Sequence, residues 1–320
     1  MRKIASVLSA AVLTLTLCAC SSGSSTSSIT VAGSTTCLPI AEIAAEGFKE
    51  EAGTDVLVSG LGSSAGIEAV SNGTADIAAL PTNAAAALYN KTDGAVQVLA
   101  LNTRGVLYVV TDGTENITSF ADLRGKTVYV PVQNPTFIFQ YLCEKNGLTA
   151  GTDITIDNTY AQPAELNTAL ASGEVHIAVL PEPMVTIARA ANPELTAALD
   201  LTAEWDKVAP AGSLVQGCVV VRKAFADEHP NEVKAFLDEY KASIEFLTAE
   251  PEQAGQMIEE AGIFAKAAVA AKAIPNCNVC FVAGAEMQAP LTAFLTALST
   301  VAPQSIGGSV PGDDFYCVLK

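Results

Sequence analysis

Short apolar runs alternate with longer amphipathic runs along most of the chain. The short runs are rich in Val and Ile, which favour strands, and the longer runs have helical spacing. The predicted strands are 29–32, 55–58, 76–80, 96–100, 106–110 and 214–221, and the predicted helices are 39–52, 67–70, 231–247, 251–261, 266–274 and 285–298. A second alternating series is expected between 126 and 201. This alternation predicts an α/β fold with mostly parallel sheets flanked by helices.

Two clusters of turn-forming residues, at 111–114 and 209–212, divide this series. A repeat links the parts: Gly73–Pro81 reads GTADIAALP and Gly173–Pro181 reads GEVHIAVLP. Any α/β protein can contain two similar helix–strand units, but the length of the shared string favours two equivalent lobes. Ligands of open α/β sheets bind beyond the carboxyl ends of strands, so both repeat loops are expected to face one cleft.

The first residues have the layout of a secretory signal. Arg2 and Lys3 precede an apolar run that ends in Leu17-Cys18-Ala19-Cys20, and serine-rich residues follow. The run is short for a membrane span. Its last four residues resemble the lipobox of bacterial lipoproteins, which implies a signal peptide over 1–19, a lipid on Cys20 and a tether over 20–28. An ordinary signal peptide with an incidental cysteine is the alternative.

The rest of the chain contains no segment long and apolar enough to span a bilayer, so the body is expected outside the cytoplasm, anchored to the bacterial cell membrane. The formal charge is −17, and removal of the signal takes away two basic residues and no acid. This acidity argues against nucleic acid as a partner but allows one anion in a local positive field. With 320 residues, the chain is long enough for two lobes.

Six of the eight cysteines remain if Cys18 is discarded and Cys20 is lipidated. They are Cys37, Cys143, Cys218, Cys277, Cys280 and Cys317. Cys277-Asn278-Val279-Cys280 is a lone CxxC that could be a redox pair or half of a zinc site. The sequence offers no second CxxC or HxxxH to complete four ligands, so neither a metal nor another cofactor is expected.

The chain resembles type II periplasmic solute-binding proteins of ABC importers in three features. These are the two turn-forming clusters at 111–114 and 209–212, the stretch SFADLRGK at 119–126, and the helical C-terminal third. The resemblance implies lobe 1 from residues 29–111 and 213–320, lobe 2 from residues 112–212, and a ligand cleft between them. From Thr82 onward the chain is similar to nitrate/sulfonate/taurine-type binding proteins, on the strings VPVQNPT at 130–136 and LPEP at 180–183.

The N-terminal part resembles phosphate-binding proteins instead, on GSTT at 33–36 and VSGLGSSAGI at 58–67. In that family such loops hold phosphate through hydroxyls and backbone amides. The chain departs from the family pattern where Leu80-Pro81-Thr82-Asn83 and Gln133–Thr136 replace residues of the phosphate cage. The ligand class therefore stays open between an oxyanion and an organic solute such as a sulfonate or a pyrimidine-like compound.

The candidate ligand-binding residues lie mainly at turns between strand ends and helix starts, where unpaired N–H groups favour negative charge. They are Ser34, Thr35, Thr36, Ser63, Ser64, Thr82, Asn83, Arg104, Asn134, Thr136, Gln162 and Glu182. Arg104 is the cationic candidate, and Glu182 could accept an ammonium or a ring N–H. Helix capping is the alternative role for the Ser, Thr and Asn residues, and structural pairing is the alternative for Arg104.

The string GSSAG at 62–66 also fits the G-x-S-x-G turn of serine hydrolases, with Ser64 as nucleophile. Such an enzyme needs a histidine base, and only His176 and His229 exist. Neither is convincingly placed, so no enzymatic activity is expected. A surface lipoprotein without a transport role is the third alternative. The expected function is capture of a small ligand by lobe closure, by a monomer that delivers it to a membrane permease.

Overall fold

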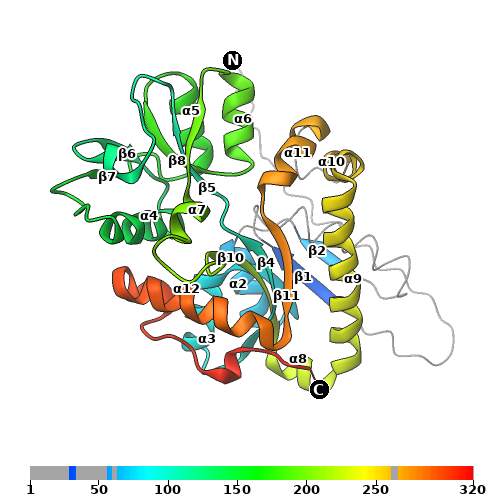
Figure 1. Ribbon diagram of the computed structural model, residues 1–320. Coiled ribbons are helices and arrows are strands. Elements are labelled where there is room, and N and C mark those ends of the chain that lie inside the picture. The colour runs from blue at the N-terminus through cyan, green and yellow to red at the C-terminus, as the bar shows by residue number, and fades with distance from the viewer. Residues whose placement is uncertain (1–28, 34–55, 60–62, 261–265, 320) are drawn as a thin grey trace, which may run out of the picture.

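The computed structural model describes residues 29–33, 56–59, 63–260 and 266–319 (Figure 1). Two separate sheets, each flanked by helices, define two lobes. Lobe 1 has the strand order β11-β4-β10-β3-β1-β2, and lobe 2 has the order β7-β6-β8-β5-β9. The two-lobed α/β architecture predicted from the sequence is therefore confirmed.

Lobe 1 is built from both ends of the described chain. Its strands are β1 (Ile29–Gly33), β2 (Val56–Ser59), β3 (Ile77–Pro81), β4 (Val96–Arg104), β10 (Val215–Arg222) and β11 (Val279–Ala283). Its helices are α2 (Ser63–Asn72), α3 (Thr82–Lys91), α8 (Lys223–Glu228), α9 (Pro230–Ala249), α10 (Pro251–Glu260), α11 (Ala267–Ala273) and α12 (Gln288–Val301). The 3-10 helices η2 (Ile274–Asn276), η3 (Gly284–Met287), η4 (Pro303–Ile306) and η5 (Asp313–Phe315) complete it.

Lobe 2 is a single stretch of the chain. Its strands are β5 (Leu107–Thr111), β6 (Thr127–Tyr129), β7 (Thr155–Asp157), β8 (Ile177–Pro181) and β9 (Thr196–Asp200). Its helices are α4 (Asn134–Lys145), α5 (Pro163–Ala171), α6 (Met184–Ala191) and α7 (Leu201–Trp205), with the 3-10 helix η1 (Phe120–Leu123).

The internal repeat forms the centre of each sheet. Strand β3 pairs antiparallel with β10, from Pro81 opposite Gly217 to Ile77 opposite Val221, and β8 pairs with β5 in a ladder of the same length. On its other side each repeat strand runs parallel to a neighbour, β1 in lobe 1 and β6 in lobe 2. The repeat thus marks two units with the same local topology.

A pair of side chains links neighbouring strands at the start of each repeat strand, with the acidic residue before the repeat strand in lobe 1 and after its antiparallel neighbour in lobe 2. In lobe 1 the Arg222 Nε donates to the Asp76 carboxylate at 2.8 Å. At the equivalent place in lobe 2 the His176 Nδ1 lies 2.6 Å from the Asp112 carboxylate. Partial burial acts to raise the pKa of Asp112, but hydrogen bonds from Thr114 and His176 leave it below its usual range. Each half therefore keeps the cross-strand link although the residue types differ.

Three sequence expectations need correction. The sheets are mixed rather than mostly parallel, because β4 leads out of lobe 1 and β10 returns into it beside β4 in the opposite direction. Strand β5 belongs to the lobe 2 sheet, whereas a boundary between 111 and 112 would assign it to lobe 1. Strand β11 was not expected in the helical C-terminal third, and it pairs with β4 at the edge of the sheet. The expected helix at 39–52 lies outside the described residues.

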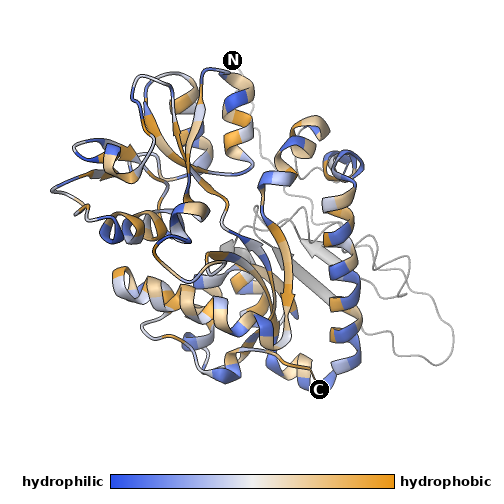
Figure 2. Cartoon of the chain, in the orientation of Figure 1, coloured by the Kyte–Doolittle hydropathy of each residue, from blue (hydrophilic) through white to orange (hydrophobic). Residues whose placement is uncertain are grey.

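One hydrophobic core continues from lobe 1 into lobe 2, whereas the opposite faces of the two sheets have separate cores. The lobe 1 core on that opposite face is covered in part by α9, which alternates hydrophobic and hydrophilic residues along its length (Figure 2). Its buried residues, including Val233, Phe236 and Tyr240, recur every three to four positions, as expected of an amphipathic helix. The lobes thus share a core on one face of their sheets and have separate cores on the other face.

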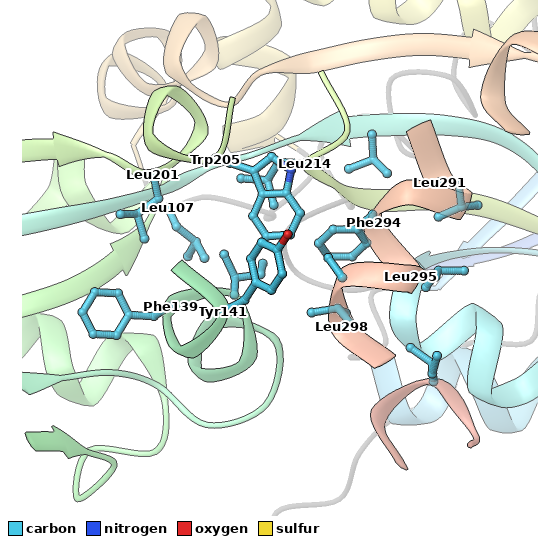
Figure 3. Packing of buried hydrophobic residues seen from close by; sticks show 14 of the residues in the cluster. Leu107, Phe139, Tyr141, Leu201, Trp205, Leu214, Leu291, Phe294, Leu295 and Leu298 are labelled. Atoms are coloured by element: carbon cyan, nitrogen blue, oxygen red, sulfur yellow. The ribbon is translucent and has the colours of Figure 1, made fainter. Parts of the chain in front are cut away.

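Three aromatic rings pack against one another in tilted orientations where the shared core passes between the lobes (Figure 3). Tyr141 of α4 packs on Trp205 of α7 with ring centroids 4.7 Å apart, and Trp205 packs on Phe294 of α12 at 5.6 Å. The Trp205 indole N–H donates to the Ser213 hydroxyl at 2.8 Å, so its polar group is satisfied despite complete burial. We call Tyr141, Trp205 and Phe294 the aromatic seam.

Two glycines allow the chain segments at the crossing between lobes to approach closely. A Cβ on Gly105 would lie 2.5 Å from the Leu214 Cδ2 and would also collide with the Thr202 hydroxyl. A Cβ on Gly217 would meet Thr103 Oγ1 at 2.9 Å and collide with the Asn102 amide. Contacts this short cannot be relieved without a shift of the packed neighbours. The close packing around Gly105 and Gly217 therefore leaves no room for a larger side chain at either position.

We expect Gly105→Ala to destabilise the protein by about 1–3 kcal/mol, the usual cost of overpacking a filled interior. Urea unfolding measures the change. Gly312→Ala is the matched control, because a Cβ there meets its nearest atom only at 3.4 Å and the backbone φ is −82°. Equal stability of Gly105→Ala and wild type would show that the crossing has slack that the packing does not suggest.

Candidate functional site

The turns expected to bind ligand follow strands that end at one edge of each sheet. In lobe 1, β1 and β3 are parallel with Gly33 opposite Ala79, so the chain leaves both strands on the same side. In lobe 2, β6 and β8 are parallel, with the same consequence for the turns after Tyr129 and Pro181. The crossing between β4 and β5 connects the two sheets. This topology is that of a cleft site between lobes.

Part of the predicted lobe 1 site lies outside the described residues, namely Ser34, Thr35 and Thr36, as does the lipid-attachment residue Cys20. Ser63 and Ser64 are the first residues of α2. Thr82 and Asn83 begin α3 and are buried. The Thr82 hydroxyl donates to the carbonyl of Val215 at 2.7 Å, which links the repeat turn to the returning strand β10.

Asn83 and Asn134 occupy the first turns of α3 and α4, one in each lobe. Their side chains are 8% and 9% exposed, and neither amide oxygen has a hydrogen-bond partner among the described residues. The Asn83 amide nitrogen donates to the carbonyl of Ser305 in η4 at 3.5 Å. Because buried polar atoms are nearly always paired, an unpaired amide at a helix start indicates a place for a polar ligand atom or a water.

The other predicted lobe 2 residues brace loops. The Thr136 hydroxyl donates to the Pro131 carbonyl at 2.7 Å and accepts from the Asn158 amide at 2.8 Å. Gln162 is the N-cap of α5, and its backbone N–H donates to the Glu165 carboxylate at 3.4 Å. Gln162 thus holds the capping position that was the alternative to ligand binding, whereas Thr136 links two loop residues and caps no helix.

Glu182, the one carboxylate among the predicted site residues, is buried, with 3% of its surface exposed. It follows β8 directly, and its two oxygens accept hydrogen bonds from the Thr186 N–H at 3.1 Å and the Thr186 hydroxyl at 3.0 Å. Burial raises the pKa of Glu182, although these bonds and the charge of Arg189 oppose the rise. Glu182 thus caps the first turn of α6 and keeps unused acceptor capacity in a dry environment.

Two residues that sequence reasoning missed lie beside Glu182. Burial, together with Asp200 and Glu182, raises the pKa of the Tyr108 hydroxyl to about 12. Burial and Glu182 raise the pKa of the Cys277 thiol to about 12. Tyr108 belongs to lobe 2, whereas Cys277 precedes β11 in lobe 1. The repeat offered a signal for Tyr108, because its ladder position next to the crossing matches that of Cys218 in lobe 1.

Arg104 hydrogen-bonds to neighbouring segments at the crossing between the lobes. Its guanidinium donates to the carbonyl of Gly212 at 2.9 Å, which links the outgoing and returning segments. Its backbone N–H donates to the Asn278 carbonyl at 3.0 Å. Burial raises the pKa of the Cys280 thiol to about 11, and the neighbouring Arg104 opposes that rise. The structural pairing considered for Arg104 is therefore what the structure shows.

The histidines do not assemble a hydrolase site around Ser64. His176 pairs with Asp112 at the start of β8, the end opposite the cleft turn at Pro181. His229 lies 3.7 Å from Glu232 and packs on the ring of Phe225. Ser64 begins α2, which follows the carboxyl end of β2 in lobe 1. The base needed for a nucleophilic serine is thus placed elsewhere.

No group of three or more His, Cys, Asp or Glu side chains among the described residues is arranged to hold a metal ion. Within the same residues, no helix combines the length and hydrophobicity needed to cross a membrane.

Residues 38–254 match the family model described as NMT1/THI5 like. The chain belongs to the NMT1/THI5-like family. A comparison with curated proteins finds no match. The fold is that of the periplasmic binding proteins, and the resemblance to solute-binding proteins of the nitrate/sulfonate/taurine type is confirmed.

Three solved structures illustrate the likeness. An ABC transporter protein from Parabacteroides distasonis is 23% identical with a TM-score of 0.76, over 92% of this chain and 99% of that chain. The periplasmic aliphatic sulphonate binding protein of Escherichia coli is 14% identical with a TM-score of 0.71, over 88% and 95% of the two chains. A zinc-bound ligand-binding component of an ABC-type import system from Staphylococcus aureus is 15% identical with a TM-score of 0.66, over 91% and 96%.

The pH dependence of stability tests the environment of Glu182. Because its folded-state pKa is raised, the stabilisation from its protonated form is complete below the unfolded-state pKa of about 4.3 and is lost as pH rises through the folded-state value. We expect Glu182→Gln, which cannot ionise, to gain stability relative to wild type as pH rises from about 4 to about 8.

Urea unfolding over a pH series measures this difference. Glu194→Gln removes an exposed carboxylate and serves as control, with a difference from wild type that stays flat. A stability difference for Glu182→Gln that shrinks with rising pH would contradict a raised pKa.

Proposed function

We propose that the chain is the lipid-anchored, extracytoplasmic solute-binding component of an ABC importer, and that it captures a small ligand by closure of its two lobes. The NMT1/THI5-like family and the periplasmic binding protein fold support this function. The observation that carries it is the pair of matched lobes, in which parallel strands end in turns that contain the buried polar groups of Asn134 and Glu182. We infer that these turns face one crevice between the lobes.

Several groups must act together in such a site. Micromolar affinity needs about 8 kcal/mol, whereas one neutral hydrogen bond contributes roughly 0.5–1.5 kcal/mol. Closure that sums contacts from both lobes is therefore the natural mechanism, and the ligand drives it only by binding the closed form better. A monomer suffices for this mechanism, with the membrane permease as partner of the closed form.

The polar groups favour a small, heteroatom-rich ligand. The unpaired amide oxygen of Asn134 at the start of α4 can accept a hydrogen bond from a ligand, and the helix start itself favours negative charge. The buried carboxylate of Glu182 can accept from an ammonium or a ring N–H but disfavours a bare phosphate. An organic solute that combines an acidic group with N–H donors, or a pyrimidine-like compound, fits these groups better than inorganic phosphate.

A thermal-shift screen with phosphate, nitrate, taurine, alkanesulfonates and pyrimidines tests the function. We expect an organic compound to raise the melting temperature. Asn134→Ala should then weaken its binding about 3- to 10-fold, the loss of one hydrogen bond, in isothermal titration calorimetry. Gln140→Ala, on the outer part of the same helix and bonded only to Glu144 among the described residues, should bind as wild type. A screen in which no compound raises the melting temperature would favour a non-transport surface lipoprotein.

Lipid anchoring has its own test. We expect Cys20→Ser to move the protein from the membrane fraction to the soluble fraction of cells and to abolish incorporation of an alkyne-labelled fatty acid. Cys18→Ser, which leaves the attachment position intact, should keep both properties. Retention of the label in Cys20→Ser would place the lipid elsewhere.

A further inference from the structure

The two lobes touch on both sides of the crossing, but the contacts differ in kind. On one side α4 and α12 pack together through the aromatic seam, within a core shared by both lobes. On the other side α11 of lobe 1 contacts α6 of lobe 2, while the cores beneath these helices are separate. Figure 1 shows the two approaches on opposite sides of the molecule.

The contacts on the second side come from one short segment of lobe 1, residues 267–278. Helix α11 opens this segment, and the carbonyl of Asn276 accepts a hydrogen bond from the Tyr108 hydroxyl of lobe 2 at 3.4 Å. Next along the chain is Cys277, and the charge of Glu182 in lobe 2 helps to raise the pKa of this thiol. The segment thus reaches the opposite lobe at the turn that follows the repeat strand β8.

The far end of this segment is fixed to the crossing. The Asn278 amide donates to the Gly105 carbonyl at 2.6 Å, and the Asn278 carbonyl accepts from the Arg104 N–H at 3.0 Å. Asn278 has a φ of 46°, the left-handed region that Asn tolerates better than most residues. The segment therefore moves with lobe 1, whereas Tyr108 and Glu182 move with lobe 2.

The contacts on the two sides of the crossing differ in how easily they can be broken. Buried aromatic packing forms many non-directional contacts that survive a small rotation, so the aromatic seam is suited to act as a pivot. The contacts on the second side are a helix rich in alanine and one long hydrogen bond between partly exposed residues, which are broken more easily. We propose that residues 267–278 form a clasp that holds the closed form, and that the lobes open between α6 and α11 about the aromatic seam.

The clasp rests on the proposed function, because it specifies the closure that captures ligand. The clasp proposal adds the direction in which the lobes open and names residues at which the opening can be measured. Cys277 then lies in the contact that forms and breaks, next to the Glu182 turn. A ligand that touches this turn stabilises the clasp through the same residues, which couples binding to closure.

Two spin-label pairs measure the motion directly by electron–electron double resonance. Labels attached through unnatural amino acids leave the native cysteines in place. The clasp pair joins Ala190 on α6 to Lys272 on α11, and the seam pair joins Glu144 on α4 to Thr300 on α12; all four positions are exposed. Both pairs are measured in otherwise wild-type protein and in Cys277→Trp, in which the larger side chain acts as a wedge in the clasp.

We expect Cys277→Trp to add a longer-distance population to the clasp pair and to leave the seam pair unchanged. Ala268→Trp, an exposed position of the same helix α11, is the matched control and should change neither pair. Circular dichroism verifies that each variant is folded. If Cys277→Trp does not fold, Cys277→Met and Tyr108→Phe provide a smaller wedge and the loss of one clasp hydrogen bond, with the same expected direction.

The proposal is overturned if the seam pair lengthens as much as the clasp pair, or if folded clasp variants leave the clasp pair unchanged. The measurement needs no ligand, so its failure is separate from failure of the binding screen. A compound that binds without altering the clasp pair in a wedged variant would contradict the clasp while supporting the solute-binding function.

Discussion

The packing of Trp205 between Tyr141 and Phe294 is the contact on which the arrangement of the two lobes depends. It brings a helix of each lobe into one core, so neither lobe buries that face of its sheet alone. A cleft protein must hold its halves in register and yet let them separate. Apolar packing on one side and sparse polar contact on the other meet both demands, because the first tolerates rotation and the second is readily broken.

The matched halves show which features of the repeat are structural and which differ between lobes. The ladders of β3 with β10 and of β8 with β5 have the same length, and each repeat strand starts at a side-chain pair, Arg222 with Asp76 and His176 with Asp112. At the cleft ends of these strands the residues diverge. Thr82 is neutral and bonded to β10, whereas Glu182 is acidic and caps α6. The two repeat strands therefore end in turns of different chemistry on the same backbone frame.

Much of the fold could be predicted from the sequence, because strand–helix alternation and the repeat are both visible within short contiguous stretches of residues. The repeat located both central strands and the turns that follow them. Strand β11 was missed because its residues, VCFVA, sit among helical segments, and only the edge of β4 makes them a strand. The aromatic seam was invisible for a related reason, since Tyr141, Trp205 and Phe294 are distant in sequence and carry no pattern that links them.

The candidate site was only partly predictable, because residue type does not reveal which partner a polar group has. Arg104 was a cationic candidate by charge, and the sequence could not show that one of its guanidinium nitrogens donates to the carbonyl of Gly212 on the returning segment. Thr136 had the composition of a ligand turn and instead braces Pro131 and Asn158. The repeat could have pointed to Tyr108 through its ladder position opposite Leu180, whereas Cys277 belongs to the other lobe and is linked to Glu182 only by tertiary structure, which neither motif nor spacing carries.

The seam is tested most directly through the emission of Trp205, because the sequence contains one tryptophan and it lies at the centre of the seam. Urea unfolding followed by this emission and by far-ultraviolet circular dichroism compares the seam with the whole fold. A core shared by both lobes predicts that the two transitions coincide. A Trp205 transition that is complete while most secondary structure persists would contradict the shared core, because the lobes would then separate as independent units.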